Sequence, residues 1–262
     1  MTDFELAVCS EMVFTELPLL ERVRRIRDMD FAVEIWSWHD KDLAALAATG
    51  ARFTSMTGYL HGDLIDPATA DEVVRTAELS IKAAETLGVS RLNLHTAELD
   101  GEGRAVRPRQ RATGEMWVTA LRTLERIGDL GAEAGVQFCV ENLNTIVDHP
   151  GIPLARAKDT LALIEGVAHP NIKMMLDLYH AQIGEGNLIE LVRRCGAAIG
   201  EIQVADVPGR CEPGTGEINY PAIAKALRDI GFTGTIGMEA WASGAGIEGS
   251  EAALEAFRAA FI

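Results

Sequence analysis

The chain alternates short apolar runs with longer amphipathic segments from one end to the other. The apolar runs predict buried strands, and segments with an apolar residue every three or four positions predict helices. The predicted strands lie near residues 5–10, 31–36, 51–56, 91–95, 136–141, 172–177, 199–204 and 235–239. The predicted helices lie near residues 16–28, 40–49, 68–87, 110–134, 157–167, 187–196, 219–230 and 247–260. Strand–helix units without a long linker predict a closed parallel barrel rather than an open sheet.

The length supports this prediction, because 262 residues are close to the roughly 250 of a (β/α)8 barrel. We therefore expect an α/β protein, with residues 1–262 forming a single TIM-barrel domain. Glycines that can end helices follow four of the helical patterns, at Gly50, Gly88, Gly135 and Gly231. Asn219 fits an N-cap with Pro221 in the first turn. The sequence has no phosphate-binding glycine motif after a strand.

Composition narrows the partners and the compartment. Hydrophobic residues make up 48% of the chain, and the formal net charge is -15 with a pI of about 4.8. Such a chain repels phosphate backbones, so we expect no nucleic-acid partner. The four cysteines are scattered without a CxxC pair, which predicts free thiols in a reducing cytoplasm. We expect no signal peptide at residues 1–5 and no membrane-spanning run.

Polar residues end four consecutive predicted strands: Glu141, Asp177, Gln203 and Glu239. Chemistry in TIM barrels takes place at the C-terminal ends of the strands. Carboxylates that meet there repel one another unless a cation lies between them. Any one of these residues could simply bond a loop, but four at corresponding positions predict a site for a hard divalent cation with oxygen ligands.

The alternation of side chains within the strands supports this site. Glu141 shares its strand face with Cys139 and Gln137, whereas Phe138 and Val140 occupy the opposite face. The polar face would point into the barrel, and the apolar face would pack against the outer helices.

Five segments resemble the hydroxypyruvate isomerase family: residues 140–144 (VENLN), 177–180 (DLYH), 203–206 (QVAD), 210–220 (RCEPGTGEINY) and 231–239 (GFTGTIGME). That family belongs to the xylose-isomerase-like TIM barrels, which include the tagatose and psicose 3-epimerases. The resemblance covers essentially the whole chain and is most specific between residues 140 and 240. It implies a small-molecule substrate, with hydroxypyruvate converted to tartronate semialdehyde as the leading expectation, and association as a homo-oligomer.

The resemblance also implies one divalent metal ion, Mg2+ or Mn2+, held by Glu141, Asp177, Gln203 and Glu239. Related epimerases usually carry histidine where Gln203 stands. The metal would stabilise an enediolate, while Glu141 and Glu239 remove and return a proton as the catalytic pair. Which glutamate acts first depends on the handedness of the substrate.

The same resemblance implies substrate-binding roles for His180, Arg210 and His61. At the C-terminal end of the predicted barrel, Trp36 and Trp241 could form the side of a sugar-binding pocket or simply cover the core. One feature departs from the family. A basic residue that usually follows the last strand's glutamate is missing after Glu239, so the substrate could be a neutral sugar, or Arg210 could hold its carboxylate.

Other classes remain open on these residues. A ketose 3-epimerase fits the same ligands, and so does a lyase acting on an inosose or a 3-keto sugar. A nuclease of the endonuclease IV type needs a histidine-rich zinc cluster and a basic face, which six histidines and a charge of -15 disfavour. A non-catalytic sugar-binding protein would have no need to retain all four ligands.

Overall fold

The computed structural model describes residues 4–262 and confirms the predicted α/β fold. Met1–Asp3, part of the segment in which no signal peptide is expected, lie outside the described residues. Eight parallel strands pair in chain order and close into a barrel. They are β1 Glu5–Cys9, β2 Ala32–Glu34, β3 Phe53–Thr57, β4 Arg91–Leu94, β5 Gln137–Glu141, β6 Ile172–Asp177, β7 Ile199–Val204 and β8 Thr235–Met238.

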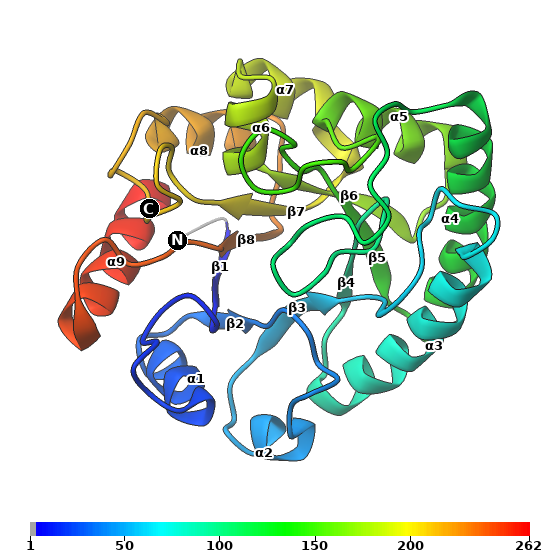
Figure 1. Ribbon diagram of the computed structural model, residues 1–262. Helices are drawn as coiled ribbons and strands as arrows, with labels where there is room; N and C mark the ends of the chain where they lie inside the picture. Colours follow the sequence, from blue (N-terminus) through cyan, green and yellow to red (C-terminus); the bar gives the residue numbers. More distant parts are fainter. Residues whose placement is uncertain (1–3) are drawn as a thin grey trace.

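The helices surround this ring of strands (Figure 1). Their bounds are α1 Leu19–Asp28, α2 Leu43–Ala47, α3 Ala70–Leu87, α4 Gly114–Ala134, α5 Ala157–Val167, α6 Leu178–Gly184, α7 Leu188–Cys195, α8 Tyr220–Asp229 and α9 Gly246–Phe261. The apolar strand faces pack against them as expected, since Phe138, Val140, Ile202 and Val204 are fully buried in the main core. None of the helices in the described part of the chain is long and apolar enough to cross a membrane.

The helix ends follow local chemistry. Gly88 and Gly135 adopt left-handed conformations with φ of 70° and 72° as the C-caps of α3 and α4. The Asn219 side chain accepts a hydrogen bond from the Ala222 N–H, with a proline in the first turn of α8. The predicted start of α2 was three residues early, because Asp42 caps the helix and marks its true start.

The sequence pattern missed α6. Only one helix, at residues 187–196, was predicted between strands six and seven, yet a seven-residue helix begins immediately after Asp177. Such a helix has fewer than two turns, too few to give an apolar period. Asp177 is its N-cap and accepts the N–H of His180 at 2.6 Å. The residue read only as a possible metal ligand therefore also starts a helix.

The barrel interior is polar at both ends. At the N-terminal end, Arg91 donates to the Thr235 hydroxyl at 2.9 Å, and that hydroxyl donates to Glu5 at 2.7 Å. Arg52 pairs with the same glutamate at 2.6 Å. This network gives the buried Thr235 hydroxyl both a donor and an acceptor at the end of the barrel away from the mouth.

Candidate active site

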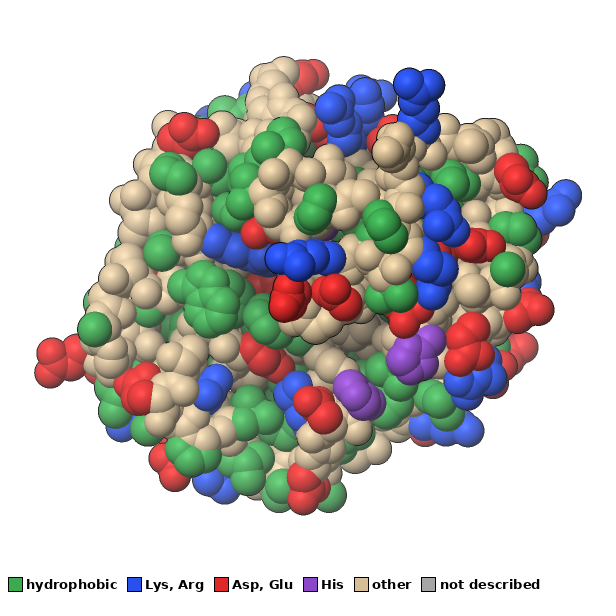
Figure 2. All heavy atoms as spheres, in the orientation of Figure 1, with side chains coloured by type: hydrophobic (Ala, Val, Ile, Leu, Met, Phe, Trp, Pro, Cys, Tyr) green, Lys and Arg blue, Asp and Glu red, His purple; other side chains and the backbone are tan. Residues whose placement is uncertain are grey.

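The strand register brings the predicted ligands together. Asp177 on β6 is the direct neighbour of Gln203 on β7. Glu141 on β5 pairs with Met175, two residues before Asp177 and on the same strand face. Glu239 directly follows β8. Seen from the side shown in Figure 2, acidic and basic side chains lie next to one another near the centre of this face of the molecule.

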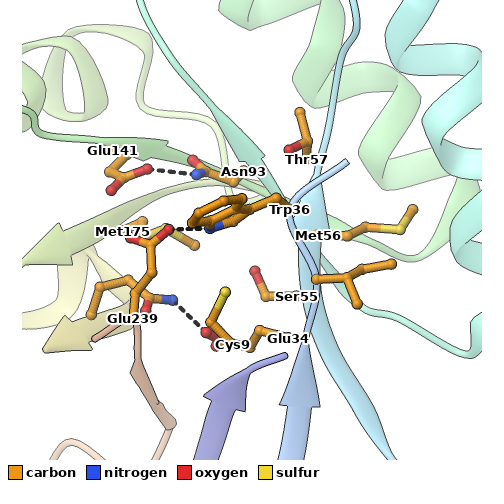
Figure 3. A pocket seen from close by; sticks show the side chains of 12 residues that line it. Cys9, Glu34, Trp36, Ser55, Met56, Thr57, Asn93, Glu141, Met175 and Glu239 are labelled. Carbon is orange, nitrogen blue, oxygen red and sulfur yellow. Dashed lines mark hydrogen bonds between the residues drawn. The ribbon is translucent and has the colours of Figure 1, made fainter. Parts of the chain in front are cut away.

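A cavity lies at this end of the barrel (Figure 3). The polar side chains that line it include Glu34, Asn93, Glu141, Gln203 and Glu239. Three of the four predicted ligands therefore border the same space.

Glu141 is 5% exposed and accepts two hydrogen bonds through Oε2. One comes from the Asn93 amide at 2.6 Å, and the other involves Nε2 of His95 at 3.1 Å. Burial by itself raises the pKa of Glu141, but these hydrogen bonds and the nearby imidazole outweigh burial and lower it. Glu141 is thus held as a carboxylate that can accept a proton.

Asp177 and His180 lie beside Glu141. One oxygen of each carboxylate and a ring nitrogen of His180 lie within 4.8 Å of one another, so this group could hold a metal ion. Burial and repulsion from Glu141 raise the pKa of Asp177 well above its usual value. A cation placed there would relieve both effects.

Hydrogen bonding distinguishes His180 from the two carboxylates. The Asn144 amide lies 2.7 Å from Nδ1, and because the amide oxygen accepts backbone N–H groups of Val147 and Asp148, its NH2 group faces the imidazole. Burial lowers the pKa of His180 well below its usual value, so the ring is neutral. Nδ1 then accepts, and the proton lies on the buried Nε2, which has no partner within the described residues. A neutral N–H donor suits a substrate oxygen better than a metal.

Gln203 meets a residue that the sequence analysis missed. Its Nε2 donates to Oε2 of Glu34 at 3.0 Å, while its Oε1 is buried and has no hydrogen-bond partner among residues 4–262. Burial and repulsion from Glu201 raise the pKa of Glu34, and burial also raises the pKa of Glu201. The same strand-end rule that found Glu141 could have found Glu34, but the predicted strand ran on to Trp36.

Glu239 is held by two donors from different loops. The Trp36 indole N–H donates to Oε1, and Arg210 donates to Oε2 at 2.6 Å. Burial raises the pKa of Glu239 and repulsion from Glu141 adds to it, while Arg210 opposes both. Arg210 also stacks over the Tyr179 ring at 5.1 Å, and its Nε is buried with no hydrogen-bond partner in the described chain. One guanidinium donor therefore stays available beside the glutamate.

The RCEPGTGEINY segment forms the loop that carries Arg210. The buried Asp206 carboxylate accepts the backbone N–H groups of Val207, Gly214 and Ile218 at 2.9–3.0 Å. Glu212 binds the Ser243 N–H at 2.8 Å and its hydroxyl at 2.5 Å. The loop after strand eight is thus anchored to the loop that carries Arg210.

Replacing Asp206 by alanine should loosen this loop. Each buried N–H left without an acceptor costs roughly 1–3 kcal/mol, so we expect a loss of about 3 kcal/mol in unfolding free energy. Each kcal/mol lowers Tm by roughly 2–4 °C in a chain of this size. Thermal unfolding and amide hydrogen exchange of residues 207–218 would measure the change. Unchanged exchange would contradict it, and Glu217→Ala, an exposed position in the same loop, is the matched control.

Two histidines lie outside the group formed by Glu141, Asp177 and His180. His61, predicted to bind substrate, is 62% exposed in its side chain and pairs with Glu98 at 3.0 Å, away from the cavity lining. His149 lies in the loop after β5, where its ring is buried and meets that of His180 edge-on at 4.9 Å. No periodic signal marks His149 in the sequence, because it lies in an irregular loop.

The residues at the mouth fit a divalent cation. Two close carboxylates offer the hard oxygen ligands that such ions prefer, and Gln203 adds a buried amide oxygen with no hydrogen-bond partner among residues 4–262. Glu239 would have to exchange its bonds to Trp36 and Arg210 to join them.

The barrel fold and the polar residues at its strand ends are features of one protein family. A profile of the xylose isomerase-like TIM barrel matches residues 12–260, so the chain belongs to this family. This confirms the relationship inferred from the motifs between residues 140 and 240.

The chain is also similar to named proteins and to solved structures. A Danio rerio protein named "Putative hydroxypyruvate isomerase" is 30% identical over 94% of this chain and 91% of its own length. A 2-oxo-tetronate isomerase of Cupriavidus necator is 36% identical over 46% of each chain, so the match spans about half of that relative. A solved Brucella melitensis structure described as an AP endonuclease, family 2, superposes with a TM-score of 0.82 at 26% identity, covering 95% of this chain and 96% of that one.

Proposed function

We propose that the protein is a divalent-metal-dependent isomerase of a small α-hydroxy carbonyl compound, with hydroxypyruvate converted to tartronate semialdehyde as the leading reaction. One observation carries the proposal. Glu141 and Glu239 line the same cavity as Gln203, whose amide oxygen has no partner among the described residues. Two proton-transfer groups and a candidate ligand thus share one small space.

The proton moves between the two glutamates and the substrate. One carboxylate removes the proton from the hydroxyl-bearing carbon next to the carbonyl, and a glutamate returns a proton to the former carbonyl carbon. The hydroxyl proton passes to the former carbonyl oxygen, so the carbonyl and the hydroxyl exchange places. Glu141 is fitted to accept, because hydrogen bonds from His95 and Asn93 favour its ionised form. Glu239 lines the same cavity and would be the second proton-transfer group. Which glutamate starts depends on the substrate's handedness.

Glu141, Asp177, Gln203 and Glu239 would hold the Mg2+ or Mn2+ ion. When bound, the ion would polarise the substrate carbonyl and stabilise the negative charge of the enediolate. The protein's own residues place the substrate. His180 offers its Nε2–H to a substrate oxygen, and Arg210 offers its unpartnered Nε to a hydroxyl or carboxylate. His61, which is exposed and pairs with Glu98, would contact only a substrate that extends beyond the cavity lining.

The names of related chains and the net charge of this chain indicate the substrate class. Related chains named for hydroxypyruvate and 2-oxo-tetronate support a three- or four-carbon 2-oxo acid. Ketose 3-epimerisation and lyase chemistry begin with the same proton removal and are the alternatives. A DNA substrate is disfavoured, despite the fold of the Brucella protein, because a net charge of -15 repels phosphates.

A substrate panel tests this proposal. The Mn2+-loaded protein would be incubated with hydroxypyruvate, a 2-oxo-tetronate and C4 to C6 ketoses, and products would be followed by NMR. We expect an isomerised product from a 2-oxo acid with the highest kcat/KM. Epimerised ketose without isomerised acid would move the assignment to an epimerase. An eliminated product would move it to a lyase.

A further inference from the structure

Glu34 is the one acidic side chain of the cavity lining to which the proposed reaction gives no task. It ends β2 and is 4% exposed. Its Oε2 accepts the Nε2–H of Gln203 at 3.0 Å. Figure 3 shows its carboxylate at the base of the cavity, below Trp36 and Glu239. Burying an acidic group lowers the stability of the fold, so we looked for a role of Glu34 in its contact with Gln203.

The hydrogen bond fixes which way the Gln203 carboxamide points. A carboxamide can present either its oxygen or its NH2 group to a neighbour, and only the oxygen can bind a cation. Glu34 accepts from the NH2 group, so the flipped amide would bring two oxygens face to face. Oε1 of Gln203 is consequently buried and has no hydrogen-bond partner among the described residues.

The neighbouring strand leaves room for this arrangement. Gly237 on β8 pairs in register with Gln203, and a Cβ atom at position 237 would overlap both carboxylate oxygens of Glu34. The space that holds the Glu34 carboxylate therefore depends on a glycine from a different strand. This feature is independent of the hydrogen bond itself.

We propose that Glu34 is a positioning residue that orients the Gln203 carboxamide so that its oxygen is presented to the divalent cation. The inference deepens the proposed function and rests on its metal site. Partners of this kind fix the direction of a ligand and typically change metal affinity by roughly 10–100-fold when removed. It assigns Glu34 no contact with the substrate and no proton transfer.

Mn2+ binding, measured by calorimetry and electron paramagnetic resonance, tests this inference without any turnover. Glu34→Leu should weaken Mn2+ binding by roughly 10–100-fold, because the amide loses the acceptor that orients it. Glu34→Gln should bind Mn2+ nearly as well as the wild type, because its amide oxygen still accepts the hydrogen bond. Equal losses in both variants would assign the effect to charge and overturn the proposal, as would full affinity in Glu34→Leu.

Three further variants complete the design. Gly237→Ala should weaken Mn2+ binding by displacing the Glu34 carboxylate, and it carries the test if Glu34→Leu does not fold. Glu217→Gln changes an exposed carboxyl that does not line the cavity and should leave Mn2+ affinity unchanged. In a Gln203→Leu background, Glu34→Leu should cause no further loss, whereas additive losses would overturn the proposal.

The outcomes separate this inference from the proposed reaction. Tight Mn2+ binding that depends on Glu34, in a protein that isomerises no compound of the panel, would leave the inference standing and remove the reaction. Normal turnover, together with an Mn2+ affinity that does not change when Glu34 is replaced, would support the proposed reaction and overturn the inference about Glu34. No Mn2+ binding by the wild type would overturn both.

Discussion

Replacing Glu239 by glutamine is expected to lower kcat by roughly 10²–10⁴-fold, the usual contribution of a positioned acid or base. Glutamine keeps the size of the side chain and one oxygen, but it cannot take up or release the proton. In the wild type, one carboxylate oxygen accepts from Trp36 and the other accepts from Arg210. The NH2 group of glutamine cannot accept a hydrogen bond, so it cannot replace either oxygen. Steady-state kinetics on the best substrate of the panel would measure the change.

The matched control lies in the segment of residues 210–220 but outside the cavity lining. Glu217 is exposed, and its carboxylate accepts the Gln182 amide at 3.0 Å. Glu217→Gln should therefore leave kcat unchanged. Wild-type turnover in Glu239→Gln would show that this glutamate transfers no proton, and a loss shared equally with Glu217→Gln would show a general effect on folding.

Removing divalent metal is expected to abolish turnover and lower thermal stability together. A cation at the site supplies several kcal/mol of transition-state charge stabilisation, which corresponds to a loss of roughly 10³-fold or more. Restoring Mg2+ or Mn2+ at 100 times its Kd should stabilise the fold by about 2.7 kcal/mol. At roughly 2–4 °C per kcal/mol, Tm should rise by about 5–11 °C.

The pH dependence of this effect has a defined sign. Asp177 and Glu239 must lose their protons to bind a cation, and burial raises the pKa of both carboxyl groups in the absence of one. Mn2+ affinity should therefore fall as the pH drops toward these raised values. Asp177→Asn should show little metal-dependent shift in Tm. Full activity after exhaustive chelation would contradict the account.

The strand ends could be predicted because buried parallel strands carry a strong local signal. β6 and β7 begin and end at the predicted residues, and Asp177 and Gln203 follow from those ends. Side-chain alternation then placed Glu141 and Glu239 on the inner face without any tertiary information.

Residues whose position depends on tertiary contacts could not be found in this way. β2 has only three residues, and its register with β3 shifts between Val33 and Glu34, so the predicted strand end fell on Trp36 instead. The tautomer of His180 depends on Asn144, which lies 36 residues away in the chain. Interactions of this kind leave no period in the sequence.

Proton exchange in D2O tests the central claim most directly. The Mn2+-loaded protein would be incubated with hydroxypyruvate, with the Glu239→Gln variant beside it, and NMR would follow both deuterium uptake and product. The account predicts deuterium at the carbon next to the carbonyl and a new isomer, with both lost in the variant. Bound Mn2+ without deuterium exchange into hydroxypyruvate or any ketose of the panel would contradict it.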